Sequence, residues 1–188
     1  MELLEAIKGR RSVRAYQEQP VPEETIRQLL EYATYAPSGS NLQPWRFAVV
    51  QDQEILKKWS DEAKAFLLTK VPERPYLQQY KAVLENQSFN IFYSAPALLL
   101  VFGDSRKSMT YINDCSMAAQ NIMLAAHSLG LGSCWIGFFV EYGNKPEFKL
   151  ALDIPEYYKL IAPLTLGYPR GSWPMPPRQP AEVLFWKK

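Results

Sequence analysis

The side chains that most often carry catalysis are scarce in this sequence. There is one histidine, His127, and there are two cysteines, Cys115 and Cys134. His127 falls inside a long helical pattern, where a structural role is commoner than a catalytic one, and no Ser/Cys–His–acid set can be assembled around it. Two thiols are too few for an iron–sulfur cluster or a four-thiolate zinc site, and no metal-ligand spacing is present, so no metal is expected. An enzyme of this composition needs a bound cofactor to supply its chemistry.

A basic cluster near the N-terminus offers one kind of cofactor contact. It consists of Arg10, Arg11, Ser12 and Arg14. In one interpretation the cations cap the carbonyl end of a short helix and otherwise face solvent. In the other they bind a phosphate, because a guanidinium is a fixed fork of donors that matches phosphate oxygens. Alternate side chains of an extended segment share a face, so Arg10, Ser12 and Arg14 would act together.

Two loops are rich in small residues. The stretch "YAPSGSNLQPWRFAVV" at residues 35–50 has more small polar groups than a chain reversal needs. It is either an ordinary helix-to-strand loop anchored by Trp45 or a loop whose backbone approaches a ligand. The stretch "GLGSCWIG" at residues 130–137 follows a helical pattern, so it does not fit the dinucleotide glycine motif, and Gly130 fits a helix cap.

Composition narrows the class of protein. The chain has 188 residues, 47% of them hydrophobic and 21% charged, and a net charge of +2, which is typical of a globular domain and not of a nucleic-acid-binding one. The longest apolar run, "APALLLVF" at residues 95–102, is too short to cross a membrane, and the N-terminus lacks the order of a signal peptide. Two cysteines fit a reducing compartment. We therefore expect a cytoplasmic protein without membrane or nucleic-acid partners.

Hydrophobic periodicity predicts helices that alternate with strands. The expected helices lie at residues 2–8, 22–34, 53–69, 111–129 and 146–152. The expected strands lie at 47–50, 95–104 and 160–169, with a strand or turn at 133–140. The helix at 111–129 is apolar almost all round, so we expect it to be deeply buried. The order of elements predicts helices layered on a sheet.

Two segments fit this pattern less well. Residues 74–94 are aromatic-rich and form either a helix or a lid. The tail is proline-rich and then ends in the apolar sequence "VLFW" at residues 183–186. Because an exposed apolar patch is unfavourable in water, the tail needs a surface on its own domain or on a partner.

Four segments together resemble the FMN-dependent nitroreductase family. They are "AIKGRRSVRAY", "APSGSNLQPWRFAVV", "AAQNIMLAAHSLGLGSCWIG" and "LGYP" with the later "PPR", in the family's order and over nearly the whole chain. The resemblance implies an α+β, three-layer α/β/α fold with a mixed, mostly antiparallel central sheet. It also implies one domain over residues 1–188, an intertwined homodimer, and a tail (about 170–188) that wraps the partner subunit.

The resemblance also implies an FMN site. Arg10, Arg11 and Ser12 would bind the phosphate and ribityl chain, Arg14 would lie beside the pyrimidine edge, and Arg178 would close on the phosphate. The loop that reaches the flavin from the other subunit would contribute Pro37, Ser38, Gly39, Asn41 and Gln43. The segment against the ring would be Trp135, Ile136 and Gly137, with the Gly137 backbone N–H near flavin N5.

The implied activity is a ping-pong NAD(P)H oxidoreductase. Hydride would pass from NAD(P)H to flavin N5, and two electrons would then pass to a small-molecule acceptor such as a nitroaromatic or a quinone. Other acceptors, through ene reduction or reductive dehalogenation, stay open, as does a flavin storage or sensing role. A nucleic-acid-binding role for the arginines is disfavoured by the low net charge.

Overall fold

The computed structural model describes all 188 residues and is built on a four-stranded sheet. The strands are β1 (Trp45–Val50), β2 (Ala97–Asp104), β3 (Gly132–Trp135) and β4 (Tyr158–Gly167), in the spatial order β1-β2-β4-β3. All three neighbouring pairs are antiparallel. The parallel component is limited to an isolated bridge between Ser12 and Ser133. All eight residues of β2 are buried, as its apolar sequence predicts.

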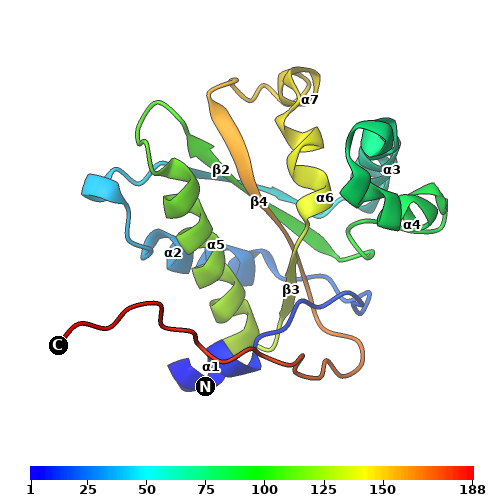
Figure 1. Cartoon of the computed structure of the whole chain (residues 1–188). Helices are drawn as coiled ribbons and strands as arrows, with labels where there is room; N and C mark the ends of the chain where they lie inside the picture. The colour runs from blue at the N-terminus through cyan, green and yellow to red at the C-terminus, as the bar shows by residue number, and fades with distance from the viewer.

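Helices cover both faces of this sheet (Figure 1). They are α1 (Leu3–Gly9), α2 (Glu23–Thr34), α3 (Gln53–Lys70), α4 (Lys81–Glu85), α5 (Tyr111–Ser128), α6 (Gly137–Val140) and α7 (Pro146–Leu150). Residues 97, 99 and 101 of β2 join a core with α2 and α5, whereas residues 98, 100 and 102 join a second core with α3, α6 and α7. The period of two along the strand thus produces the expected three layers.

The long helix α5 is buried on only one side. Small residues such as Ala118, Ala119 and Ala126 let it pack closely on the sheet, and they are fully buried. On the outer side Ile112 is 52% exposed and Met117 is 37% exposed. The expectation of burial all round was therefore wrong for the isolated chain, because the sheet covers one side of α5 and no layer of the same chain covers the other.

Residues 71–94 form several short helical turns. These are η2 (Val71–Glu73), η3 (Pro75–Tyr80) and α4, followed by turns up to β2. Pro75 is the first residue of η3 and Pro72 is the second of η2, because proline fits the start of a helical turn but not a helix interior. The segment at 133–140 also divides, into β3 and then α6.

The C-terminal tail is extended and exposed. After β4 it passes α1 and the end of α5 and then runs away from the body of the chain (Figure 1). Leu184, Phe185 and Trp186 are 98%, 79% and 75% exposed, respectively. Within one chain no other segment therefore covers the apolar end of the tail, although its apolar side chains favour burial. None of the helices has the length and apolar character needed to cross a membrane.

Candidate functional site

The arginine cluster lies in an extended segment beside β3. The bridge between Ser12 and Ser133 and a hydrogen bond from the Val13 amide to the Ser133 carbonyl (3.0 Å) hold it there. Tyr16 secures its far end, because its buried hydroxyl donates to the Val13 carbonyl at 2.8 Å. An extended backbone is the geometry on which Arg10, Ser12 and Arg14 were expected to share a face, and that expectation stays a prediction.

Three residues of this segment lie near the buried thiol of Cys134. Burial raises the pKa of Cys134, and the charge of Arg14, a contact from Ser12 and the charge of Arg10 oppose this increase. The three alternate residues therefore all act on one atom of β3. Burial, and then the charges of Arg178 and Arg11, lower the pKa of Arg10. Arg178, in the tail, therefore lies near Arg10.

These cations have no anionic partner in the chain. The ion pairs of the structure include none of Arg10, Arg11, Arg14 and Arg178. Clustered like charges are unfavourable unless an anion compensates them. The unpaired cluster therefore fits an anionic ligand such as a phosphate.

Arg11 points away from that face. One of its guanidinium nitrogens donates to the carbonyls of Lys8 (2.7 Å) and Arg10 (2.8 Å), which end helix α1. Arg11 and Arg10 both line a 250 Å³ cavity, together with His127 and Trp173. Arg11 Nε and Trp173 Nε1 are both buried without an acceptor. This second cavity is thus rich in donors. His127 also lines it, and burial together with the charges of Arg11 and Arg10 lowers the pKa of His127.

A larger cavity of 540 Å³ lies beside β3 and the start of α6. Arg14 and the residues Cys134 to Gly137 form one side of it. A Cβ atom at Gly137 would meet nothing within 4 Å, so the cavity opens directly onto its backbone. Helix α6 begins at Gly137 without a side-chain cap, and the first amides of a helix have no partner within it. The expected ring-binding segment therefore borders a cavity with a backbone donor available.

The far side of this cavity is aromatic. Tyr76, Tyr80 and Tyr93 line it there, and the remaining lining residues are Leu67, Leu77, Ile91, Phe138 and Glu141. Tyr93 lies close to Arg14: burial raises the pKa of Tyr93, and Arg14 opposes this increase. Tyr93 and Ser94 both have left-handed backbone conformations, with φ of 55° and 51°. Strained backbone of this kind persists only where the surroundings hold it.

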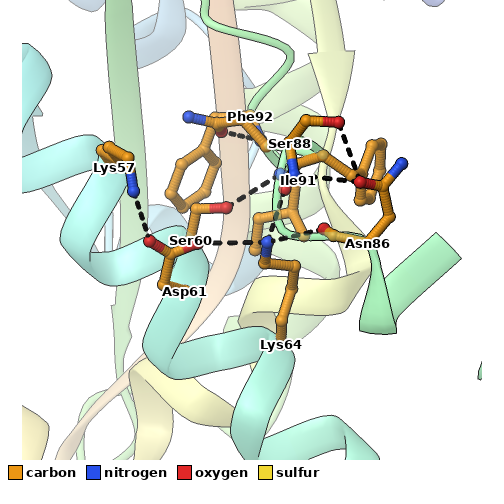
Figure 2. Close-up of polar contacts among 10 residues, drawn as sticks. Lys57, Ser60, Asp61, Lys64, Asn86, Ser88, Ile91 and Phe92 are labelled. Atoms are coloured by element: carbon orange, nitrogen blue, oxygen red, sulfur yellow. Dashed lines mark hydrogen bonds and ion pairs between the residues drawn. The ribbon is translucent and has the colours of Figure 1, made fainter.

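A buried lysine holds the segment that leads to Tyr93 (Figure 2). Lys64 of α3 donates to the carbonyls of Phe89 at 2.6 Å and Asn86 at 3.1 Å, and it pairs with Asp61 at 3.1 Å. Ser60 of the same helix accepts from the Ile91 amide at 3.0 Å. Residues 86–91 are thereby fixed to α3 just before the strained Tyr93.

The loop with Pro37, Ser38, Gly39, Asn41 and Gln43 lies elsewhere, because none of these residues lines either cavity. The loop is fixed by its own contacts: Ser38 Oγ accepts from the Gln43 amide at 3.1 Å, and buried Asp114 accepts from the Gly39 amide at 3.2 Å. Trp45 after it is buried in the core, as expected of an anchor. One chain thus brings together the arginines and Trp135 to Gly137, but not this loop.

Comparison with known proteins agrees with this geometry. The family model described as the nitroreductase family matches residues 7–168. The chain belongs to the nitroreductase family. It is 37% identical over 172 residues to a protein of Methanothermobacter thermautotrophicus named as an NADH dehydrogenase/NAD(P)H nitroreductase, covering 90% of this chain and 78% of that one.

Two further relatives bear on the site. A solved nitroreductase with bound FMN from Bacteroides fragilis superposes with a TM-score of 0.83 at 30% identity and covers 100% of both chains. Iodotyrosine deiodinase 1 of Rattus norvegicus is 29% identical over 184 residues, which are 91% of this chain and 64% of that protein. The first supports the fold that the resemblance implied, and the second shows that nitroreductase-like chains also carry other names.

Sequence reasoning missed the aromatic side of the cavity in this nitroreductase family member. Tyr76, Tyr80 and Tyr93 all come from the segment that was left open between helix and lid. The signal available was the density of tyrosines in "ERPYLQQYKAV" and "NIFYS", which no helical stripe explained. Glu141 gave no signal, because only the fold brings it to this cavity.

Proposed function

We propose that this chain is an FMN-dependent oxidoreductase that takes hydride from NAD(P)H and passes two electrons to a nitroaromatic or quinone acceptor. The observation that carries the proposal is an arginine cluster without anionic partners, of which Arg14 lines a 540 Å³ cavity that opens onto the Gly137 backbone and Arg10 and Arg11 line a second cavity. The similarity over the whole chain to an FMN-bound nitroreductase supports it. FMN, when bound, supplies the hydride chemistry. For a quinone the reaction balances as hydride from NAD(P)H plus one proton from water, giving a hydroquinone and NAD(P)⁺.

The residues of the chain have distinct roles in this proposal. Arg10, Ser12 and Arg178 bind the phosphate with charge-assisted hydrogen bonds. Arg14 would lie at the pyrimidine edge, where its positive charge would stabilise negative charge on the ring. Trp135 to Gly137 pack against the ring and present a backbone donor. No acid–base side chain is needed, because the cofactor supplies the hydride chemistry. The residues of the chain bind and orient the cofactor and exclude water.

We also propose that the active form is a homodimer. The support is an apolar surface that one chain leaves open, with Leu3 and Leu4 of α1 and Ile112 and Met117 of α5 all exposed. In the dimer the loop with Pro37, Ser38, Gly39, Asn41 and Gln43 would reach the partner's flavin site. The tail, at about residues 170–188, would cover part of the partner, and residues 1–188 would form one domain.

Flavin binding tests the proposal. Purified protein should retain FMN, and anaerobic mixing with NADH or NADPH should bleach the flavin absorbance within seconds. The double variant Arg10→Ala, Arg14→Ala should lose FMN, whereas Arg27→Ala, which removes an exposed ion pair on α2, should keep it. A wild-type protein that neither carries nor binds FMN would show that the proposed function is wrong.

The second candidate differs in the acceptor. The similarity to iodotyrosine deiodinase 1 favours reductive dehalogenation as the alternative chemistry on the same cofactor. An anaerobic panel of nitroaromatic, quinone, ene and iodophenol acceptors separates the two, because only the true class should reoxidise the bleached flavin rapidly. Bleaching without reoxidation by any acceptor would favour storage or sensing.

A further inference from the structure

The aromatic side of the 540 Å³ cavity is a separate structural unit. Tyr76, Leu77 and Tyr80 come from η3, whereas the opposite side, Trp135 to Gly137, comes from the junction of β3 and α6. Leu77 is 1% exposed and anchors the turn, but Tyr76 and Tyr80 remain 59% and 37% exposed. We call residues 71–85 the cavity wall. Its two tyrosines line the cavity, and their rings are partly exposed rather than packed in the core.

An ion pair ties this wall to the ring-binding segment. The Arg74 guanidinium donates to both carboxylate oxygens of Glu141, with Nη2 at 3.0 Å from Oε1. Glu141 follows directly after α6, which begins at Gly137. Two parallel donors make the pair directional, so it fixes orientation as well as distance. The pair therefore holds the wall at a defined separation from Gly137.

A ring contact to α6 and an attachment to α3 also hold the cavity wall in place. The rings of Tyr80 and Phe138 meet edge to face, with centroids 5.1 Å apart and planes at 77°. At its C-terminal end the wall meets residues 86–91, which Lys64 and Ser60 bind to α3 (Figure 2). The wall is thus fixed at this end and held to α6 by Arg74 and Tyr80.

The charges of the cavity indicate what it accepts. Arg74 and Glu141 compensate each other, and Arg14, the other charged residue lining the cavity, belongs to the cofactor side. With Arg14 assigned to the cofactor, a charged acceptor entering between the tyrosines would lose hydration, and the Arg74–Glu141 pair would offer it no free partner. A flat, uncharged aromatic ring would instead contact the faces or edges of Tyr76 and Tyr80.

We propose that residues 71–85 select the acceptor of this enzyme. Tyr76 and Tyr80 form the surface for a planar, uncharged aromatic acceptor, and the Arg74–Glu141 pair is the positioning contact that sets how far this surface lies from the flavin ring. The inference rests on the proposed function, because it assigns the acceptor side of the same site. It adds residues and a substrate class that the cofactor-binding segments do not specify.

The test isolates the oxidative half-reaction. Enzyme reduced by light is mixed anaerobically with nitrobenzene, with 4-nitrobenzoate, or with ferricyanide, which needs no aromatic contact. In Tyr76→Ala and Tyr80→Ala the rate constant with nitrobenzene should fall about tenfold, since aromatic pairs contribute on this scale. The rate constant with ferricyanide and the Kd for FMN should stay within about twofold, as for substitutions away from a binding site. Wild type should prefer nitrobenzene to 4-nitrobenzoate.

Charge reversal tests the ion pair. Arg74→Glu and Glu141→Arg should each lower the rate constant with nitrobenzene about three- to fivefold, as expected of a half-exposed pair. The double variant Arg74→Glu, Glu141→Arg should recover most of it, and Arg27→Ala, from the exposed pair on α2, should match wild type.

Two outcomes would overturn the inference while leaving FMN binding and flavin bleaching intact. One is a nitrobenzene rate that is unchanged in both tyrosine variants. The other is a double charge reversal that is no better than the single ones. Loss of FMN binding or of bleaching in wild type would instead show that the proposed function itself is wrong.

Discussion

At the residue scale, the arginines of the candidate site differ from Arg74 in having no carboxylate partner. Arg10 and Arg178 lie close enough to lower the pKa of Arg10, yet neither has a carboxylate partner. Arg74 shows the opposite arrangement, with its guanidinium satisfied by Glu141. In the proposed function, the unpaired guanidinium groups would bind the cofactor, and the paired one would lie on the acceptor side.

Arg14 is expected to tune the flavin. The substitution Arg14→Gln keeps a donor but removes the charge beside the cavity. We expect the two-electron reduction potential of bound FMN to fall by about 30 mV, which corresponds to about 1.4 kcal/mol for such a couple. Spectroelectrochemistry with a reference dye measures it. An unchanged potential with normal FMN affinity would place Arg14 away from the pyrimidine edge.

His127 predicts a pH dependence of stability. Burial first, and then the charges of Arg11 and Arg10, lower its pKa from the ordinary value of 6.5. The unfolded chain therefore binds a proton more readily than the folded one, and the free energy of unfolding falls as the pH decreases from about 6.5 toward the lowered pKa. In His127→Gln this loss between pH 7 and pH 5 should be smaller. Urea unfolding of the apoprotein across this range checks it, and equal losses in both proteins would contradict it.

At the element scale, the contact between the N-terminal segment and β3 joins the fold to the site. Ser12 pairs with Ser133, and the Val13 side chain fills the space above Gly132. Gly132 has no room for a side chain, because a Cβ atom there would lie 2.7 to 2.9 Å from three atoms of Val13. A branched side chain at 13 and glycine at 132 thus allow the arginine segment to lie directly against β3.

The substitution Gly132→Ala should therefore affect both stability and cofactor binding. Overpacking of this kind costs about 1–3 kcal/mol of unfolding free energy. Because Val13 must move, Arg10 and Ser12 should shift with it and FMN affinity should fall. The double variant Gly132→Ala, Val13→Ala should recover part of both losses, as measured by urea unfolding and FMN fluorescence. If Gly132→Ala alone leaves both unchanged, this contact does not position the arginines.

At the scale of the whole molecule, one chain leaves too much apolar surface in water. Exposed groups lie on α1, on the outer side of α5 and along the tail. The loop with Pro37 to Gln43 is separate from the cavity, although the resemblance assigns it to the flavin site. A second copy of the chain would account for both observations at once.

Removal of the tail tests this arrangement. A chain that ends at residue 178 keeps Arg178 but loses Leu184, Phe185 and Trp186. We expect its dimer to dissociate at concentrations about 100-fold higher than for the full chain, which corresponds to a loss of about 2.7 kcal/mol of association energy. Light scattering across a dilution series measures this. A monomeric full-length chain would contradict the proposed homodimer.

Much of this arrangement follows from local sequence. The apolar run of β2 predicts a covered strand, and the alternation of Arg10, Ser12 and Arg14 predicts a shared face. Both are short-range patterns, with a period of two along an extended chain. Pro72 and Pro75 are equally local signals: Pro72 lies in the turn that follows α3, and Pro75 begins a turn near the start of the segment that was expected to be a helix or a lid.

The acceptor side of the cavity was decided only by the tertiary structure. Arg74 and Glu141 are 67 positions apart, and Tyr80 meets Phe138 from a distant segment of the chain. No periodicity links residues so far apart, because their contact depends on how α3, α6 and the sheet pack. The sequence by itself determined the layers, the arginine face and the likeness to flavoproteins. The fold decided which aromatic side chains face Gly137, because their approach depends on packing between distant segments.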